Sequence, residues 1–306
     1  MVICFHQSPI NVIRFIREIL LMEAVLNFHE FGEGPPEWIV ENPMTGEPSE
    51  FVNLTKTPQV IKLENARDLN LSFENHGVEI IDAASTVTDF YDDHQIDSTY
   101  LPEVDELVRR VTGCSSTYIF DVTMRTTDEK TRERYQIRSP ANFVHGDFTA
   151  SGPLNRLKHF LPEKYDALSS GRVAIVNVWR GHVNDVKQKP MAFCLNSQEE
   201  RDKSIRTIQR TSRHEPDKKV SYIEMASFSE SQQWVMFPDM KKSEAVVFKT
   251  GDTADPHSGL VHTSCDMVSS ENENTLPARH SIECRVLCFW DKGQEDGSCF
   301  SFCNVS

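Results

Sequence analysis

The sequence predicts a mainly β protein of the α+β type, with a strand-rich sandwich or barrel and flanking helices. Eight or more short strand-like runs follow residue 115, and turn residues separate them. Helices do not alternate with these strands, as a doubly wound parallel sheet would require. The glycines show no phosphate-binding spacing. These observations favour an antiparallel all-β core over a nucleotide-binding fold.

The composition is that of a globular chain with a small-molecule function. The 306 residues carry a net charge of −14, and 39% of them are hydrophobic. This charge argues against nucleic acid or an anionic membrane as the main partner, and no apolar run reaches the length of a membrane span. Eight dilute cysteines predict no disulfide framework, so we expect a reducing, cytoplasmic compartment. The oligomeric state stays open, and a homodimer is one alternative.

The N-terminal 70 residues are predicted to stand apart from the strand-rich domain, which spans 71–290. An amphipathic pattern over 10–26 predicts a helix, and the prolines of 33–58 indicate an extended arm on the surface. Met22 is an alternative start of the chain. Residues 291–306, rich in Gly, Ser and Cys, are expected to form a loose tail.

Several elements of the central domain follow from local patterns. The stretch 97–113 combines an early proline, acids first, bases last and a final glycine, and so predicts a helix; 153–168 predicts another. The stretch 126–138 indicates a charged hairpin, and 199–219 a solvated excursion. Strands are expected at 59–65, 69–73, 76–81, 116–125, 173–180, 191–195, 222–228, 233–237, 245–250, 259–268 and 280–290.

A His-x-Asp motif is the first candidate for chemistry. In a strand, the side chains of His145 and Asp147 point to the same face because the side-chain period is two. One imidazole and one carboxylate make up two thirds of the facial triad that binds non-haem Fe(II). His262 is the preferred third ligand because it lies in a strand pattern, whereas His257 follows Pro256 in a polar turn.

An arginine downstream of His262 suggests a site for a dianionic co-substrate. Arg279 and Ser281 begin the last predicted strand and share one face with Arg285. A guanidinium is well suited to bind the far carboxylate of a keto acid, and a serine hydroxyl can support it. Arg279 is the preferred clamp, and Arg285 is the alternative clamp or a substrate contact.

Structural roles compete with each of these assignments. His145 and Asp147 could be hydrogen-bonded locally, and His262 could be a core histidine. The two arginines could form ion pairs with Glu283. What favours a metal site is the order of the motifs along the chain: His-x-Asp, then strands, then His, then Arg-x-Ser.

With these motifs the chain resembles the Fe(II)/2-oxoglutarate-dependent oxygenases, and among them a fungal hydroxylase/desaturase family that includes a gibberellin desaturase. The resemblance covers about 71–290. It is carried by YLPEV (100–104), VHGDFT (144–149), NVWR (177–180), FPDM (237–240), EAVVFK (244–249), VHT (261–263) and SIECRVL (281–287).

This resemblance implies a double-stranded β-helix core and an enzyme of secondary metabolism. His145, Asp147 and His262 would hold Fe(II), with 2-oxoglutarate and O2 at the remaining positions. The enzyme would hydroxylate or desaturate a small molecule. Asn177 and Arg180 of the NVWR segment are expected to contact the substrate or support the site. Two other functions remain open: a catalytically silent β-helix protein that binds a metal or metabolite, and an iron oxygenase that does not use 2-oxoglutarate.

Overall fold

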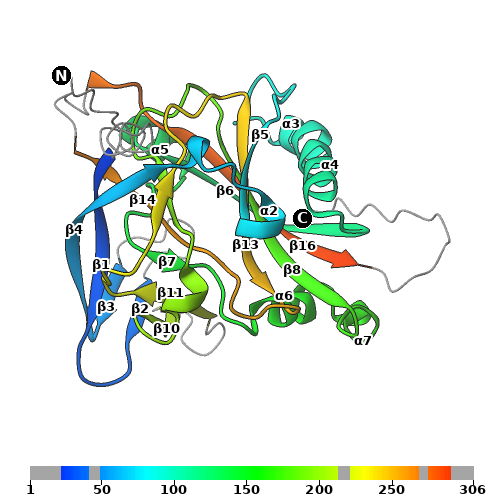
Figure 1. Cartoon of the computed structure of the whole chain (residues 1–306). Helices are drawn as coiled ribbons and strands as arrows, with labels where there is room; N and C mark the ends of the chain where they lie inside the picture. Colours follow the sequence, from blue (N-terminus) through cyan, green and yellow to red (C-terminus); the bar gives the residue numbers. More distant parts are fainter. Residues whose placement is uncertain (1–21, 41–48, 213–220, 269–274, 291–306) are drawn as a thin grey trace, which may run out of the picture.

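The computed structural model describes residues 22–40, 49–212, 221–268 and 275–290, and its strands form two sheets (Figure 1). The larger sheet has 11 strands. In hydrogen-bonding order they are β15 (Asp266–Met267), β1 (Met22–Phe31), β4 (Leu54–Asn65), β12 (Trp234–Met236), β9 (Met191–Cys194), β14 (Val261–Ser264), β7 (His145–Gly146), β11 (Ser221–Ala226), β10 (Ile205–Ser212), β2 (Glu37–Val40) and β3 (Ser49–Val52).

The smaller sheet has five antiparallel strands, with β8 at its centre. In order they are β5 (Val78–Asp82), β13 (Glu244–Asp252), β8 (Arg172–Gly181), β16 (His280–Trp290) and β6 (Ser116–Thr126). The helices are α2 (Phe73–His76), α3 (Asp93–Gln95), α4 (Leu101–Thr112), α5 (Glu129–Tyr135), α6 (Gly152–Phe160), α7 (Tyr165–Leu168) and α8 (Ser197–Glu200). Short helical turns lie at η2 (Ala66–Asp68), η3 (Ile96–Tyr100) and η4 (Pro162–Lys164). A mostly β architecture with some helices is thus confirmed.

The strand β8 is buried on both faces, as its uninterrupted apolar run predicts. Ala174, Val176 and Val178 pack in one cluster with helix α4, whereas Val173 and Ile175 pack in another cluster with helix α6. Figure 1 shows α4 on the side of the small sheet that faces away from β1 and β4. The small sheet is therefore covered by α4 on one face, while its other face packs against α6 and is turned toward the large sheet.

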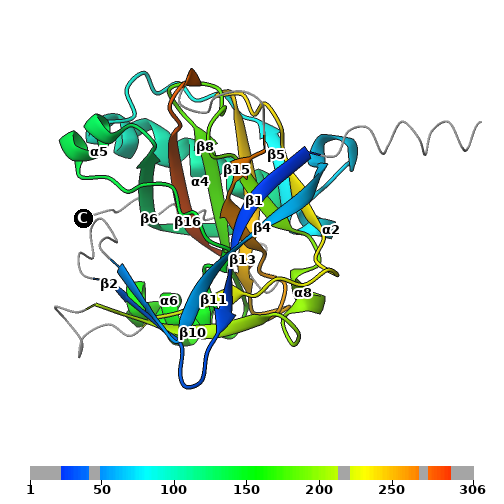
Figure 2. The same cartoon turned by 90° about the vertical axis from the view of Figure 1, so that its left-hand side faces the viewer.

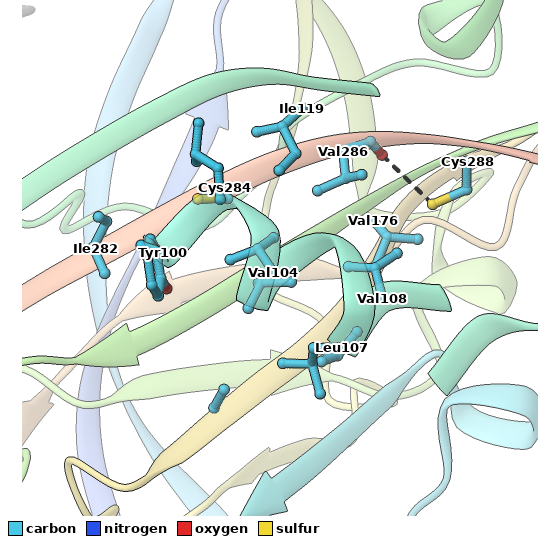
Figure 3. Packing of buried hydrophobic residues seen from close by; sticks show 14 of the residues in the cluster. Tyr100, Val104, Leu107, Val108, Ile119, Val176, Ile282, Cys284, Val286 and Cys288 are labelled. Carbon is cyan, nitrogen blue, oxygen red and sulfur yellow. Dashed lines mark hydrogen bonds between the residues drawn. The ribbon is translucent and has the colours of Figure 1, made fainter. Parts of the chain in front are cut away.

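Helix α4 forms where the sequence predicts it. Gly113, with φ of 68°, ends the helix in the left-handed region, and Arg109 and Arg110 occupy its last turn. Val104, Leu107 and Val108 pack against the even-numbered residues of β16 (Figure 3). Since the even face of β16 is used for this core, its odd face, with Ser281, Glu283 and Arg285, is directed toward the large sheet.

The segment 22–65 forms strands that belong to the large sheet. Residues 22–26, the described part of the predicted helix, are the beginning of β1, which pairs with β4 over its whole length. The predicted surface arm contains β2, β3 and the start of β4, and β2 pairs with β10. The helix prediction fails here because Leu26 and Phe28 are fully buried in the large sheet, so strand pairing outweighs the helical periodicity. In Figure 2 the paired strands β1 and β4 face the viewer.

Three further expectations are corrected. The segment predicted as a strand at 69–73 is a turn that leads into helix α2. The stretch predicted as a charged hairpin contains helix α5, which Asp128 caps by accepting a hydrogen bond from the Thr131 amide. The stretch predicted as a solvated excursion contains strand β10, paired with β11. The predictions for residues 1–21 and 291–306 lie outside the described residues. Among the described residues, we find no helix that is both long and apolar enough to cross a membrane.

Candidate metal centre

The three predicted ligands come together between the sheets. One ligand atom from each of His145, Asp147 and His262 can be chosen so that all lie within 4.8 Å of one another. His145 and His262 are directly opposite each other on the neighbouring strands β7 and β14, and their ring centroids are 4.6 Å apart. Asp147 follows β7 immediately. The strand is shorter than predicted, but the side chains meet as the spacing suggests.

Both histidines are held in the tautomer that suits a metal ligand. The Nδ1 of His145 donates to the carbonyl of Phe143 at 2.8 Å, and the Nδ1 of His262 donates to the carbonyl of Leu260 at 3.1 Å. Each Nε2 therefore keeps its lone pair. Burial, together with the neighbouring His262, lowers the pKa of His145 to about 3, so its ring is neutral at pH 7.

The Asp147 carboxylate is oriented by two residues of the small sheet. Its Oδ2 accepts hydrogen bonds from Asn177 Nδ2 at 2.7 Å and from Arg285 Nε at 3.2 Å. Its Oδ1, 3.9 Å from His145 Nε2, accepts from an Arg285 amino group at 3.1 Å. Burial alone would raise the pKa of Asp147, but the Arg285 guanidinium beside it holds that pKa well below its usual range. The carboxylate is thus ionised.

This donor set fits Fe(II). Two imidazoles and one carboxylate on one side of a site, each oriented by a second hydrogen bond, match the facial arrangement that non-haem iron uses. Asn177 is itself held in place, because its Oδ1 accepts from Thr250 Oγ1 at 3.0 Å. The site therefore has its ligands and the residues that orient them.

The two candidate clamps have different surroundings. Arg285 uses its donors on Asp147, on Asp121 at 2.6 Å and on Glu283 at 2.7 Å. Arg279 is buried over the ring of Trp179, with Nε on Ser281 Oγ at 3.1 Å, as the Arg-x-Ser pattern suggests.

A small cavity of about 20 Å³ adjoins both His145 and His262. Arg279 and Arg285 line it, and so do two residues that the sequence reasoning did not single out, Arg125 and Ser264. Burial lowers the pKa of Arg279 to about 9 and that of Arg125 to about 10, which indicates cations held in a poorly hydrated place. Arg125 ends a predicted strand on the same face as Asp121, which is the signal that could have found it.

Asn177 and Arg180 of the NVWR segment lie in different places. Asn177 contacts Asp147, whereas Arg180 lines a different cavity of about 290 Å³ together with Tyr100 and Glu103. Arg180 donates to the carbonyl of Ala83 there. A three-residue step along β8 places their side chains on opposite faces of the small sheet.

Comparison with known proteins agrees with this geometry. A family model described as the oxidoreductase/YMDC permease-like domain matches residues 26–289. The chain belongs to this oxidoreductase family.

Two relatives of this oxidoreductase have names that state an oxidative activity. The alpha-ketoglutarate-dependent dioxygenase phiK of Fungal sp. is 24% identical over 234 residues, covering 74% of this chain and 82% of phiK. The hydroxylase/desaturase CTB9 of Cercospora beticola is 27% identical, covering 76% of each chain. The resemblance to fungal Fe(II)/2-oxoglutarate oxygenases is therefore confirmed at the level of the family.

A solved structure shares the fold of this oxidoreductase. The iron and alpha-ketoglutarate-dependent endoperoxidase NvfI superposes with a TM-score of 0.74 at 21% identity, covering 89% of this chain and 99% of that one. The two proteins thus have the same overall architecture.

Proposed function

We propose that this protein is an Fe(II)/2-oxoglutarate-dependent oxygenase that hydroxylates or desaturates a small secondary metabolite. The observation that carries the proposal is the meeting of His145, Asp147 and His262 beside a cavity lined by Arg279 and Arg125. The two sheets would be the double-stranded β-helix of this enzyme class. The domain at 71–290 would supply the ligands, with 22–65 adding strands to its large sheet.

The chain's own residues would divide the work. His145, Asp147 and His262 would hold the iron, while Asn177 and Arg285 keep the carboxylate turned toward it. Bound iron would link the oxidation of 2-oxoglutarate to the oxidation of an unactivated C–H bond of the substrate.

We further propose that Arg279, with Ser281 and Arg125, binds the far carboxylate of 2-oxoglutarate. Arg279 and Arg125 line the same cavity as both histidines, so a dianion bound across it would span from the arginines to the metal. The cavity of about 20 Å³ would have to widen to accept 2-oxoglutarate. Arg285 is less suited to this role because its N–H groups already bind Asp147, Asp121 and Glu283. Its role would be to hold the ligand Asp147.

The test measures 2-oxoglutarate binding to the Fe(II)-loaded protein under nitrogen, and succinate release in air. His145→Ala should abolish both. Arg279→Gln should raise the Kd for 2-oxoglutarate about tenfold or more while metal binding persists, since a charge-assisted pair to a buried carboxylate is lost. Arg67→Gln, on an exposed arginine paired with Glu244, is the matched control.

Each alternative predicts its own result. Metal binding without any 2-oxoglutarate binding in the wild type would indicate an iron oxygenase of another kind, or a silent metal-binding protein. Consumption of O2 with substrate would separate these two. A loss of 2-oxoglutarate affinity in Arg285→Gln but not in Arg279→Gln would exchange the two arginine roles.

A further inference from the structure

A second, larger cavity adjoins the proposed metal ligands and shares Arg125, His145 and Arg285 with the small one. Its volume is about 510 Å³, within the usual range for small-molecule sites. His145 and Asp147 form part of its wall, so a molecule bound there would face the metal. Strands of both sheets, helix α6 and the segment 138–143 supply most of the remaining lining. This cavity is the natural place for the substrate of the proposed oxygenase.

The cavity is rich in cations although the whole chain is acidic. Six cationic side chains line it, against two carboxylates, in a protein of net charge −14. The cations are Lys56, Arg125, Arg138, Arg156, Arg210 and Arg285. Fe(II) and the dianion 2-oxoglutarate would cancel each other's charge, so this excess would remain once both are bound.

The two carboxylates of the cavity are already committed. Arg285 binds both, with Asp121 at 2.6 Å and Asp147 at 3.1 Å. Asp147 is in addition a proposed metal ligand. Both acids in the described wall thus pair with Arg285, and neither forms an ion pair with Arg156 or Arg210.

Three arginines converge on the outer part of the cavity from separate elements. Arg210 lies on β10, Arg156 on α6 and Arg138 in the segment before β7. Burial and the nearby Arg138, Arg285 and Arg156 lower the pKa of Arg210 to about 10. Burial and Arg285 also lower the pKa of Arg138 and of Arg156. Repulsion of this kind is relieved when an anion binds among the guanidinium groups.

Aromatic rings hold two of these arginines and form the apolar wall. The Arg210 guanidinium lies 4.8 Å from the centre of the Trp38 ring, and that of Arg156 lies 5.4 Å from the centre of the Phe148 ring. A guanidinium stacked on a ring face keeps its N–H edge available for an oxygen acceptor. The other aromatic residues of the wall are Phe51, Phe120, Phe143 and Phe160.

We infer that the substrate is an organic acid with a hydrophobic body, whose carboxylate is bound by Arg156, Arg210 and Arg138. The inference rests on the proposed oxygenase function and adds the substrate class. Its apolar body would lie against the rings, between the arginines and the metal. Planar carboxylates match the fork of a guanidinium, which a neutral ester does not.

The experiment compares 2-naphthoic acid with its methyl ester as probes, because they differ in charge and share an aromatic body. Their affinities are measured by calorimetry on protein loaded with Fe(II) and 2-oxoglutarate under nitrogen. The acid should bind wild type at least about tenfold more tightly than the ester, a difference of about 1.4 kcal/mol. Arg156→Gln and Arg210→Gln should each weaken acid binding about tenfold and leave ester binding unchanged.

Two further variants serve as controls for the Arg210→Gln result. Arg206 lies on the same strand as Arg210, with its guanidinium 4.8 Å from the centre of the Phe31 ring, and it is not in the wall of the cavity. Arg206→Gln should therefore keep the acid preference. Arg210→Lys retains the charge and should lose less acid affinity than Arg210→Gln.

Equal binding of acid and ester in wild type would overturn the inference, and so would absence of acid binding at millimolar concentration. Acid affinity that is unchanged in both Gln variants would overturn it as well. If wild type fails to bind 2-oxoglutarate, the proposed function fails instead. The acid preference is then measured on metal-free protein, since the outer arginines remain in place.

Discussion

Asp147 is held by two side chains that come from neighbouring strands of the small sheet. Asn177 on β8 and Arg285 on β16 are register partners, and both donate to the same carboxylate. A metal ligand that is fixed in this way does not have to be ordered when the metal binds.

Removal of Asn177 should therefore weaken metal binding. We expect Asn177→Ala to lower Fe(II) affinity by about 10- to 100-fold, the usual effect of losing a partner that orients a ligand. Metal titration under nitrogen measures the change. Asn155→Ala, on the exposed side of α6, is the control. Unchanged affinity in Asn177→Ala would show that Arg285 alone orients the carboxylate.

Gly146, between His145 and Asp147, has little room for a side chain. A Cβ on Gly146 would lie 2.8 Å from Glu224 Oε2, and Arg201 holds that carboxylate at 2.7 Å. We expect Gly146→Ala to destabilise the protein by about 1–3 kcal/mol through overpacking and to lower Fe(II) affinity.

Thermal unfolding and metal titration check the Gly146→Ala variant. Gly32→Ala is the control, because a Cβ there would meet its nearest atom at an ordinary 3.7 Å. A Gly146→Ala protein as stable as wild type would mean that Glu224 moves without cost.

Part of this site could be predicted from residue types and spacing. His145, Asp147, His262 and Arg279 have side chains whose chemistry is specific and whose order along the chain is informative. Asn177 was predicted near the site without its partner, because the register of β8 against β16 depends on tertiary structure. Arg125 and Arg210 were missed because a strand arginine is common and only convergence from distant segments gives it a role.

At the scale of elements, α4 shows how local signals succeed when they agree. Proline, acids, bases and glycine all indicate the same ends of the helix, and packing on β8 and β16 supports it. β10 shows the opposite case. Its polar residues suggested a solvated loop, but pairing with β11 on one side and β2 on the other makes it a strand.

Helix α4 contributes to stability through its buried face. Leu107 packs in the cluster between the helix and the small sheet and is 6% exposed. We expect Leu107→Ala to lower the free energy of unfolding by about 2–5 kcal/mol because a cavity remains. Denaturant unfolding measures the loss, with Glu106→Ala on the exposed side of the helix as control. A loss below about 1 kcal/mol would indicate that the cluster closes around the smaller side chain.

For the whole molecule, a buried histidine outside the metal site links stability to pH. His29 on β1 is fully buried beside Phe51 and Phe143, and neither of its ring nitrogens has a hydrogen-bond partner among the described residues. Burial and the nearby Lys56 lower its pKa to about 4. The unfolded chain therefore takes up a proton near pH 6.5 that the folded protein does not.

Stability should fall as the pH drops from 6.5 toward 4, and His29 has no such effect above that range. Between pH 7 and pH 5, His29 should lower the free energy of unfolding by about 2 kcal/mol. His29→Phe should remove this effect, so its unfolding free energy would depend less on pH. Denaturant unfolding at both pH values tests this, with the exposed His159→Phe as reference. Parallel curves for wild type and His29→Phe would contradict the assignment.

The short strand β7 determines how two parts of the large sheet are connected. β7 has two residues, yet in hydrogen-bonding order it joins the six strands from β15 to β14 with the four strands from β11 to β3. An ion bound by both His145 on β7 and His262 on β14 would add a link between these two paired strands. His262 belongs to the group of six strands, whereas Arg210 on β10 and Trp38 on β2, which line the cationic cavity, belong to the group of four. Metal binding would thus strengthen the connection between the four strands that line the cationic cavity and the six other strands of the sheet.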